Sequence, residues 1–189
     1  MSYDQKMNIN HDIRYKQLII DDVREGLLDY FNRFQEVKKV WRIIENKKVL
    51  IEHPFTEEMD KREKDALIMG HFAECIREGG CVFVALYQNN VIAFATLPYA
   101  FFGSRNQYVN IAEFYTSYEF RGYGIGKNLF AQCAEQGKKW GAEKLYISSH
   151  SAEETVAFYR SVGCVDAIEI NQRLAEKEPY DIQMEYSLY

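Results

Sequence analysis

Three glycines alternate with other residues in the segment RGYGIG at residues 121–126. The segment lies between a predicted strand and a predicted helix. Glycines in such a loop let the chain turn tightly and let backbone N–H groups approach a ligand, because no side chain obstructs them. Since N–H groups at a helix N-terminus attract anions, the segment favours binding of a phosphate group.

The spacing of these glycines differs from two common phosphate-binding motifs. The dinucleotide-binding motif would need a glycine at Lys127 or at Leu129. The Walker loop would need a glycine at Arg121 and a hydroxyl residue at Asn128. An enzyme that binds a nucleotide phosphate through either motif is therefore disfavoured. A turn that only reverses the chain remains an alternative.

The composition predicts a folded protein that does not bind nucleic acid. The chain has 189 residues, of which 47% are hydrophobic, and its formal net charge is −5. Nucleic acids recruit proteins with a basic excess, so this balance argues against them as partners. The polar start and the lack of an apolar run of about 18 residues predict a cytoplasmic protein with no membrane span. The length suits one domain over residues 1–189.

The cysteines show no pattern of a metal site or a disulfide framework, because no Cys-x-x-Cys pair occurs. We expect no metal. The cysteines are interpreted as small, reduced core residues: Cys75, Cys81, Cys133 and Cys164.

Two helices are expected within residues 21–80. Asp21 and Asp22 offer an N-cap for the first, and apolar residues over 23–44 have helical spacing. Apolar residues over 59–76 predict the second, which ends at a pair of glycines.

A sheet and two further helices are expected in the rest of the chain. The glycine segment opens a helix over 125–140, and an S-x-x-E capping box at Ser151 opens a shorter one that stops at Gly163. This order predicts one parallel pair of strands in an otherwise antiparallel sheet. The predicted strands are 15–20, a hairpin of 81–87 and 91–97, then 108–117, 144–149 and 182–188.

The glycine segment resembles a signature of the GNAT superfamily of acyl-CoA-dependent N-acetyltransferases. That signature is Arg/Gln-x-x-Gly-x-Gly/Ala, and Arg121, Gly124 and Gly126 match it. The strand FYT before the loop and the later helix AFYRSVG, at 157–163, also resemble family motifs. Cys164 stands where the family usually has Phe.

The resemblance extends over about residues 81–165, which would form the cofactor-binding core. It implies a single α/β (α+β) domain with a mixed, mostly antiparallel sheet flanked by helices and with splayed central parallel strands. The implied activity is transfer of an acetyl group from acetyl-CoA, the co-substrate, to a primary amine of a small acceptor by direct attack. The resemblance leaves open whether the protein forms a homodimer. The alternative is a catalytically silent acyl-CoA-binding module.

The resemblance also implies the cofactor contacts. Backbone groups of Phe114, Tyr115 and Thr116 would pair with pantetheine, and Ser149 is a candidate contact. The pyrophosphate would be bound by Arg121, Gly122, Gly124, Ile125, Gly126 and Lys127. Ala152 stands where an Asn is common in the family, and Ser151 is a candidate substitute.

Two side chains are candidates for the chemistry. Tyr159 occupies the family position that often protonates the departing thiolate, and a phenol is protonated at neutral pH. Glu113 lies on the strand before the loop, where some members carry the carboxylate that removes the amine proton. Packing is the alternative for Tyr159, and an ordinary exposed strand carboxylate is the alternative for Glu113. His150 is a weaker candidate for facing the acceptor.

The acceptor is expected between the N-terminal helices and the loop 98–107, which form the variable wall in similar enzymes. Aromatic and acidic side chains there would attract a protonated amine. The charges of 21–65 are almost balanced, so a solvated helix face is the alternative. The candidate wall residues are Tyr99, Phe101, Phe102, Asp21, Asp22, Glu25 and Asp29.

Overall fold

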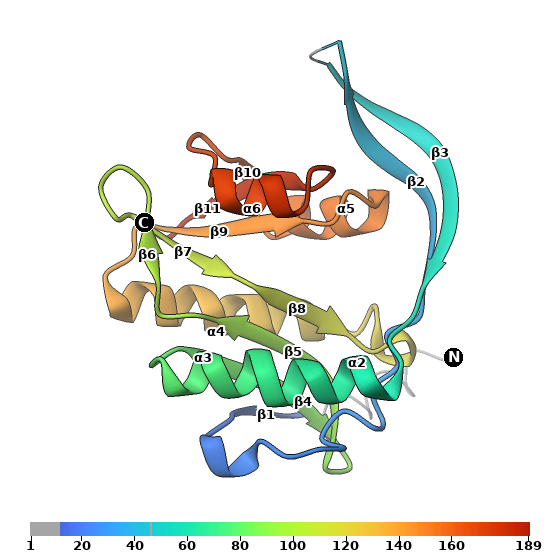
Figure 1. Cartoon of the computed structure of the whole chain (residues 1–189), viewed down its shortest axis with the longest axis vertical. Helices are drawn as coiled ribbons and strands as arrows, with labels where there is room; N and C mark the ends of the chain where they lie inside the picture. Colours follow the sequence, from blue (N-terminus) through green and yellow to red (C-terminus); the bar gives the residue numbers. More distant parts are fainter. Residues whose placement is uncertain (1–11, 46) are drawn as a thin grey trace. The chain divides into compact units, whose positions relative to one another are not determined.

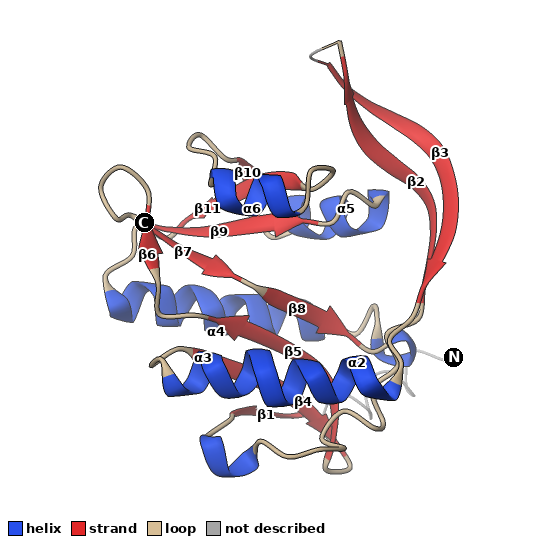
Figure 2. Ribbon diagram, in the orientation of Figure 1, coloured by secondary structure: helices blue, strands red, loops and turns tan. Residues whose placement is uncertain are grey.

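The computed structural model describes residues 12–45 and 47–189. These residues divide into two compact units. The first takes residues 12–34, 58–99 and 112–133, and the second takes 35–45, 47–57, 100–111 and 134–189. Figures 1 and 2 trace the chain through both. The expectation of a single domain stays a prediction.

The sheet of the first unit is antiparallel throughout. Its strands, in spatial order, are β1 (Arg14–Gln17), β4 (Cys81–Tyr87), β5 (Asn90–Leu97) and β8 (Glu113–Thr116). Gln88 and Asn89 join β4 to β5 with φ of 49° and 64°. Two successive left-handed residues match the twist of a tight hairpin turn. The predicted hairpin is confirmed, and the predicted first strand is present but shorter.

One helical segment covers residues 61–77 and is continuous in Figure 2. It comprises α2 (Lys61–Ala66), a π-helical turn η2 (Leu67–Phe72) and α3 (Ala73–Arg77). Asp60 and Glu63 form a reciprocal capping box at its start. Gly79 follows its end with φ of 83°, a left-handed conformation that glycine adopts readily. The second predicted helix is therefore confirmed.

Phe94 on β5 lies at the centre of the first unit's core and is fully buried. Its ring centroid is 5.0 Å from that of Phe31, 5.1 Å from Phe72 and 5.4 Å from Tyr115. Aromatic pairs at these separations add to the stabilisation that burial of their area provides. This cluster joins the helical segment and the chain around Phe31 to the sheet.

The second unit contains the parallel pair. Its sheet has the order β10 (Val165–Asp166), β11 (Ile182–Ser187), β9 (Lys144–Ser149), β7 (Tyr108–Ile111) and β6 (Phe101–Phe102). Strands β7 and β9 run parallel, as predicted, and the other pairs of this sheet are antiparallel. The predicted strand over 108–117 is divided at Ala112 between the two sheets.

Three helices follow the glycine segment. They are α4 (Ile125–Trp140), α5 (Glu153–Ser161) and α6 (Gln172–Lys177). Gly141 ends α4 with φ of 85°, and Gly163 follows α5 with φ of 98°. The first two of these helices were predicted, and α6 was not.

The predicted first helix over 23–44 is wrong. Residues Ile20–Asp22 form a single 3-10 turn, η1, and Gly26 adopts φ of 77°. The chain then forms β2 (Gln35–Ile44) and β3 (Lys47–Glu57), a long curved two-stranded ribbon in Figure 1. Residues 21–80 are therefore not mainly helical.

The misleading pattern has a physical origin in this ribbon. Val37 and Val40 are three residues apart, a spacing typical of one helix face, and both are fully buried. The register between β2 and β3 shifts between Val37 and Lys39, opposite His53-Pro54. Such an irregularity disturbs the two-residue alternation of a strand, and it accommodates a proline that cannot donate to the ladder.

The predicted capping box of α5 is also wrong. Ala152 occupies the N-cap position and no side chain caps the helix. The hydroxyl of Ser151 instead accepts a hydrogen bond from Arg42 Nη1 at 2.6 Å, and its carbonyl accepts one from Trp41 N at 2.8 Å. Ala152 packs against Val37 and Val40. The ribbon is thereby attached to the start of α5.

We predict that Gly137→Val destabilises the second unit. A Cβ at Gly137, on α4, would lie 3.1 Å from Leu188 Cδ1 and 3.2 Å from Leu145 Cδ2. Overpacking of this kind typically lowers the free energy of unfolding by about 1–3 kcal/mol. The control is Gly70→Val, since a Cβ at this helical glycine meets no atom within 4 Å. Urea unfolding measures both, and equal stability of the two variants would contradict the close approach of α4 to β9.

Candidate active site

Strand β8 is the last strand of the first unit's sheet. Phe114, Tyr115 and Thr116 pair with Ala95, Phe94 and Ala93 on β5. The other edge of β8 pairs with no strand of that sheet, and such an edge can receive an extended ligand through backbone hydrogen bonds. The Tyr115 ring packs on Phe94, with the Arg33 guanidinium 4.6 Å from its centroid. The ring serves packing, which leaves ligand contact to the backbone.

A hydrogen-bonded cluster holds the chain between β8 and the glycines. Ser117 is buried, and its hydroxyl accepts from Asn32 N at 3.0 Å and donates to Glu119 at 3.0 Å. Asn32 Nδ2 donates to the same carboxylate at 2.6 Å. Burial alone would raise the pKa of Glu119, but the Asn32 donor, a backbone N–H and the Ser117 hydroxyl together hold it below its usual value. The 3-10 turn η3 (Tyr118–Phe120) is thereby attached to the segment before β2.

The glycine loop has the geometry of an anion site. Gly122 and Gly124 adopt φ of 82° and 80°, and a Cβ at either would meet no atom within 4 Å. The first helical bond of α4 runs from Asn128 N to Gly124 O at 3.2 Å. The N–H groups of the first turn, at residues 125–127, have no carbonyl partner within the helix. They lie at the positive end of a 16-residue helix, so the loop fits a phosphate-bearing ligand.

Three other residues of the loop region are arranged around this turn. Ile125 is 1% exposed and anchors the first turn of α4 in the core. Lys127 is exposed and adds positive charge at the same end. Arg121 Nε donates to Thr116 O at 3.1 Å, so its side chain folds back along β8.

Glu113 lies at the first residue of β8, where the chain is irregular. Two successive N–H groups bond to one residue of β5: Ala112 N donates to Thr96 O at 3.0 Å and Glu113 N to Thr96 Oγ1 at 2.9 Å. Irregularities of this kind re-aim side chains. The Glu113 carboxylate is 17% exposed, and its Oε1 lies 2.8 Å from His71 Nδ1. His71 is not among the residues that the sequence indicated for the site.

Of the candidates in the second unit, Ser149 and Tyr159 are buried, whereas the His150 side chain is 35% exposed. Ser149 is 1% exposed, and its hydroxyl donates to the His150 carbonyl at 3.1 Å. His150 Nδ1 accepts from Ala152 N at 3.2 Å, and its Nε2 lies 3.5 Å from a Glu57 oxygen. Tyr159, on α5, is 5% exposed. The roles of these residues stay predictions.

The expected acceptor wall lacks its first helix, as described above. The carboxylates of Asp22 and Asp29 are paired with Lys16 and Lys61. The Phe102 ring stacks in the second unit, with its centroid 5.3 Å from that of Tyr108 and 5.2 Å from that of Tyr146. These side chains are engaged in packing or ion pairs, so the wall proposed from the sequence loses much of its support. Tyr99 is exposed.

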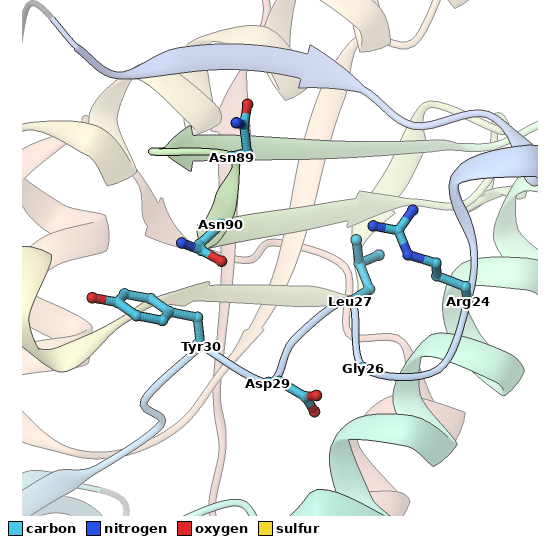
Figure 3. A pocket seen from close by; sticks show the side chains of 7 residues that line it. All are labelled: Arg24, Gly26, Leu27, Asp29, Tyr30, Asn89 and Asn90. Carbon is cyan, nitrogen blue, oxygen red and sulfur yellow. The ribbon is translucent and has the colours of Figure 1, made fainter.

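A separate polar hollow of about 270 Å³ lies in the first unit. Figure 3 labels the residues at its lining, among them Arg24, Leu27, Tyr30 and Asn90. Asp29 also lines it, so the hollow combines charges of both signs and carries no clear preference for a cation.

The cysteines are confirmed as buried, free thiols. Burial raises the pKa of Cys75 and of Cys164 to about 12, so neither is a nucleophile at neutral pH. In residues 12–45 and 47–189, no three His, Cys, Asp or Glu side chains form a group suited to a metal ion. No helix in the described part of the chain is long and apolar enough to span a membrane.

Comparison with solved structures shows acetyltransferases with the same fold. Nourseothricin acetyltransferase has a TM-score of 0.69 at 15% identity, with 94% of this chain and 99% of that chain covered. A putative streptothricin acetyltransferase from Bacillus anthracis str. Ames, in complex with acetyl coenzyme A, has a TM-score of 0.65 at 17% identity, covering 92% and 95%. An IAA acetyltransferase from Bacillus cereus ATCC 14579 has a TM-score of 0.54 at 16% identity, covering 93% and 99%.

No curated protein matches the sequence. The family model described as "Acetyltransferase (GNAT) family" matches residues 39–164. The match covers more than half of the 189 residues and includes the glycine loop, so the chain belongs to the GNAT acetyltransferase family and is an acyltransferase.

Proposed function

We propose that the protein transfers an acetyl group from acetyl-CoA to a primary amine of a small acceptor by direct attack. The observation that carries the proposal is the turn at Gly122 and Gly124, which brings backbone N–H groups to the start of α4 and leaves open the space that a Cβ at either glycine would take. Structures with the same fold contain acetyl-CoA, among them the Bacillus anthracis protein.

The first unit contains the groups that would hold acetyl-CoA. The pyrophosphate binds the N–H groups of the glycine loop and of the first turn of α4, residues 121–127, because their dipoles favour an anion. The pantetheine pairs with the outer edge of β8, at residues 114–116, as an added strand does. We also assign a cofactor contact to Ser149 of the second unit.

The chemistry needs a base, an acid and a bound thioester. Glu113 removes a proton from the acceptor ammonium, and the neutral nitrogen attacks the acetyl carbonyl carbon. The C–N bond forms, the C–S bond breaks, and the departing thiolate takes a proton from the Tyr159 hydroxyl. The products are an N-acetylated amine and CoA. The acceptor loses two protons in all. The first goes to Glu113 and from there to solvent, and the second leaves the nitrogen after attack and restores the Tyr159 phenol.

The acceptor is a small amine, and a panel identifies its class. Nourseothricin and streptothricin enter the panel because two proteins of the same fold carry their names. Polyamines, aminoglycosides, amino acids and a peptide N-terminus complete it. Thiol release from acetyl-CoA is measured with each. If acetyl-CoA stabilises the protein thermally but no amine causes thiol release from it, the protein is instead a binding module.

We predict that Gly124→Val abolishes acetyl-CoA binding. A side chain there would both strain the left-handed backbone and occupy the space in which phosphate approaches the N–H groups. The matched control is Gly141→Val at the other end of α4, where φ is 85° and the surrounding space is equally open. Calorimetry should detect binding to the control only. If a folded Gly124→Val protein binds acetyl-CoA with wild-type affinity, the loop is not part of the binding site.

We predict that Tyr159→Phe lowers kcat by about 100- to 10,000-fold with little change in acetyl-CoA affinity, as expected for loss of a general acid. Tyr180→Phe is the control, since Tyr180 is 67% exposed. Steady-state kinetics and calorimetry separate the two effects. Near-normal turnover of Tyr159→Phe would reduce this tyrosine to a packing residue.

A further inference from the structure

His71 lies in the π-helical turn of the first unit, between α2 and α3. Leu67, Ile68 and Phe72 of this turn are buried, whereas the His71 side chain is 57% exposed. A π-helical turn inside an α-helix is rare, and such turns occur frequently at functional sites. The turn therefore separates residues that hold the helix to the core from a polar side chain that is available for other contacts.

The contact of His71 is the carboxylate of Glu113. Nδ1 and Oε1 are 2.8 Å apart, a good hydrogen-bond distance, although 42 residues separate the two in the sequence. Glu113 is itself held at its backbone by Thr96. The backbone of Glu113 is thus held by β5, and its side chain is held by the helical segment.

The contact fixes the role of each atom. An ionised carboxylate only accepts hydrogen bonds, so the proton in this contact belongs to His71 Nδ1. Donation to Oε1 restricts rotation of the carboxylate, and Oε2 remains to take a proton from the amine. A base acts efficiently when it is held within hydrogen-bond reach of the proton that it removes.

We propose that His71 is a positioning residue for the reaction, and that it acts by holding the Glu113 carboxylate through Nδ1. The inference rests on the proposed function, in which Glu113 is the base. His71 itself does not exchange a proton with the acceptor.

The first experiment compares three variants in thiol release with acetyl-CoA and streptothricin, or with the fastest amine of the panel. His71→Leu removes the donor and should lower kcat about 10- to 100-fold, in the range expected for a misplaced reactive group. His71→Asn carries an amide N–H near the position of Nδ1 and should recover most of this loss. Met69→Leu, an exposed residue of the same turn, is the control and should keep wild-type kcat.

A purely structural role for His71 predicts a different result. It would affect melting temperature and acetyl-CoA affinity together with kcat, and Asn would rescue no better than Leu. The proposal predicts unchanged acetyl-CoA affinity and unchanged circular dichroism in both variants. The His71 side chain is 57% exposed, so its contact with Glu113 contributes little to stability and we expect the variants to fold.

The second experiment is a double-mutant cycle with Glu113→Gln. If His71 acts through Glu113, His71→Leu causes no further loss of kcat once Glu113 is changed. Independent, multiplicative losses, or a wild-type rate for His71→Leu beside a slow Glu113→Gln, would overturn this inference and leave the proposed function intact. A wild-type rate for Glu113→Gln would overturn it together with the role of Glu113 as base. If the wild-type protein releases no thiol from acetyl-CoA with any amine of the panel, both the inference and the proposed function are overturned.

Discussion

The start of α4 is the constraint on which the candidate site depends. The chain leaves β8, passes through η3 and turns through two left-handed glycines before the first helical bond forms at Gly124. A residue with a Cβ would be strained at either glycine and would stand in front of the N–H groups. The same turn therefore begins the helix and exposes its positive end, so folding and anion binding have a common local cause.

Contacts from distant parts of the first unit keep this turn in place. Asn32 and Glu119 bond to Ser117 before the loop, and Ile125 is buried after it. At the start of β8, Thr96 accepts two backbone N–H groups and His71 contacts the Glu113 carboxylate. Rigid elements on both sides of a loop position functional groups more accurately than the loop alone. The proposed phosphate and base sites thus belong to one supported strand and the turn that follows it.

Features with a local cause were predictable from the sequence. The glycine loop, the hairpin of 81–87 and 91–97 and the end of the helix at 140 were located correctly, and each depends on residues that adopt left-handed backbone. The parallel pair of β7 and β9 followed from the order of strands and helices.

Features that depend on distant contacts were not predictable. The spacing of Val37 and Val40 suits a helix face, but a register shift and contact with Ala152 stabilise a strand there. Ser151 has the sequence context of an N-cap. Its hydroxyl instead accepts a hydrogen bond from Arg42, which lies 109 residues earlier. His71 and Glu113 meet only because the helical segment packs on the sheet, so no local pattern indicates their contact. The role proposed for Glu113 was suggested by family resemblance rather than by its surroundings.

The most direct measurement of the central claim is an NMR titration of the ¹⁵N-labelled protein with acetyl-CoA, followed through the backbone amides of its glycines. The account predicts large amide proton shifts at Gly122, Gly124 and Gly126, since their N–H groups would donate to phosphate, and little change at Gly141 and Gly163, which follow the ends of α4 and α5. Saturable binding that leaves the three loop glycines unshifted would contradict it, because the pyrophosphate would then bind elsewhere.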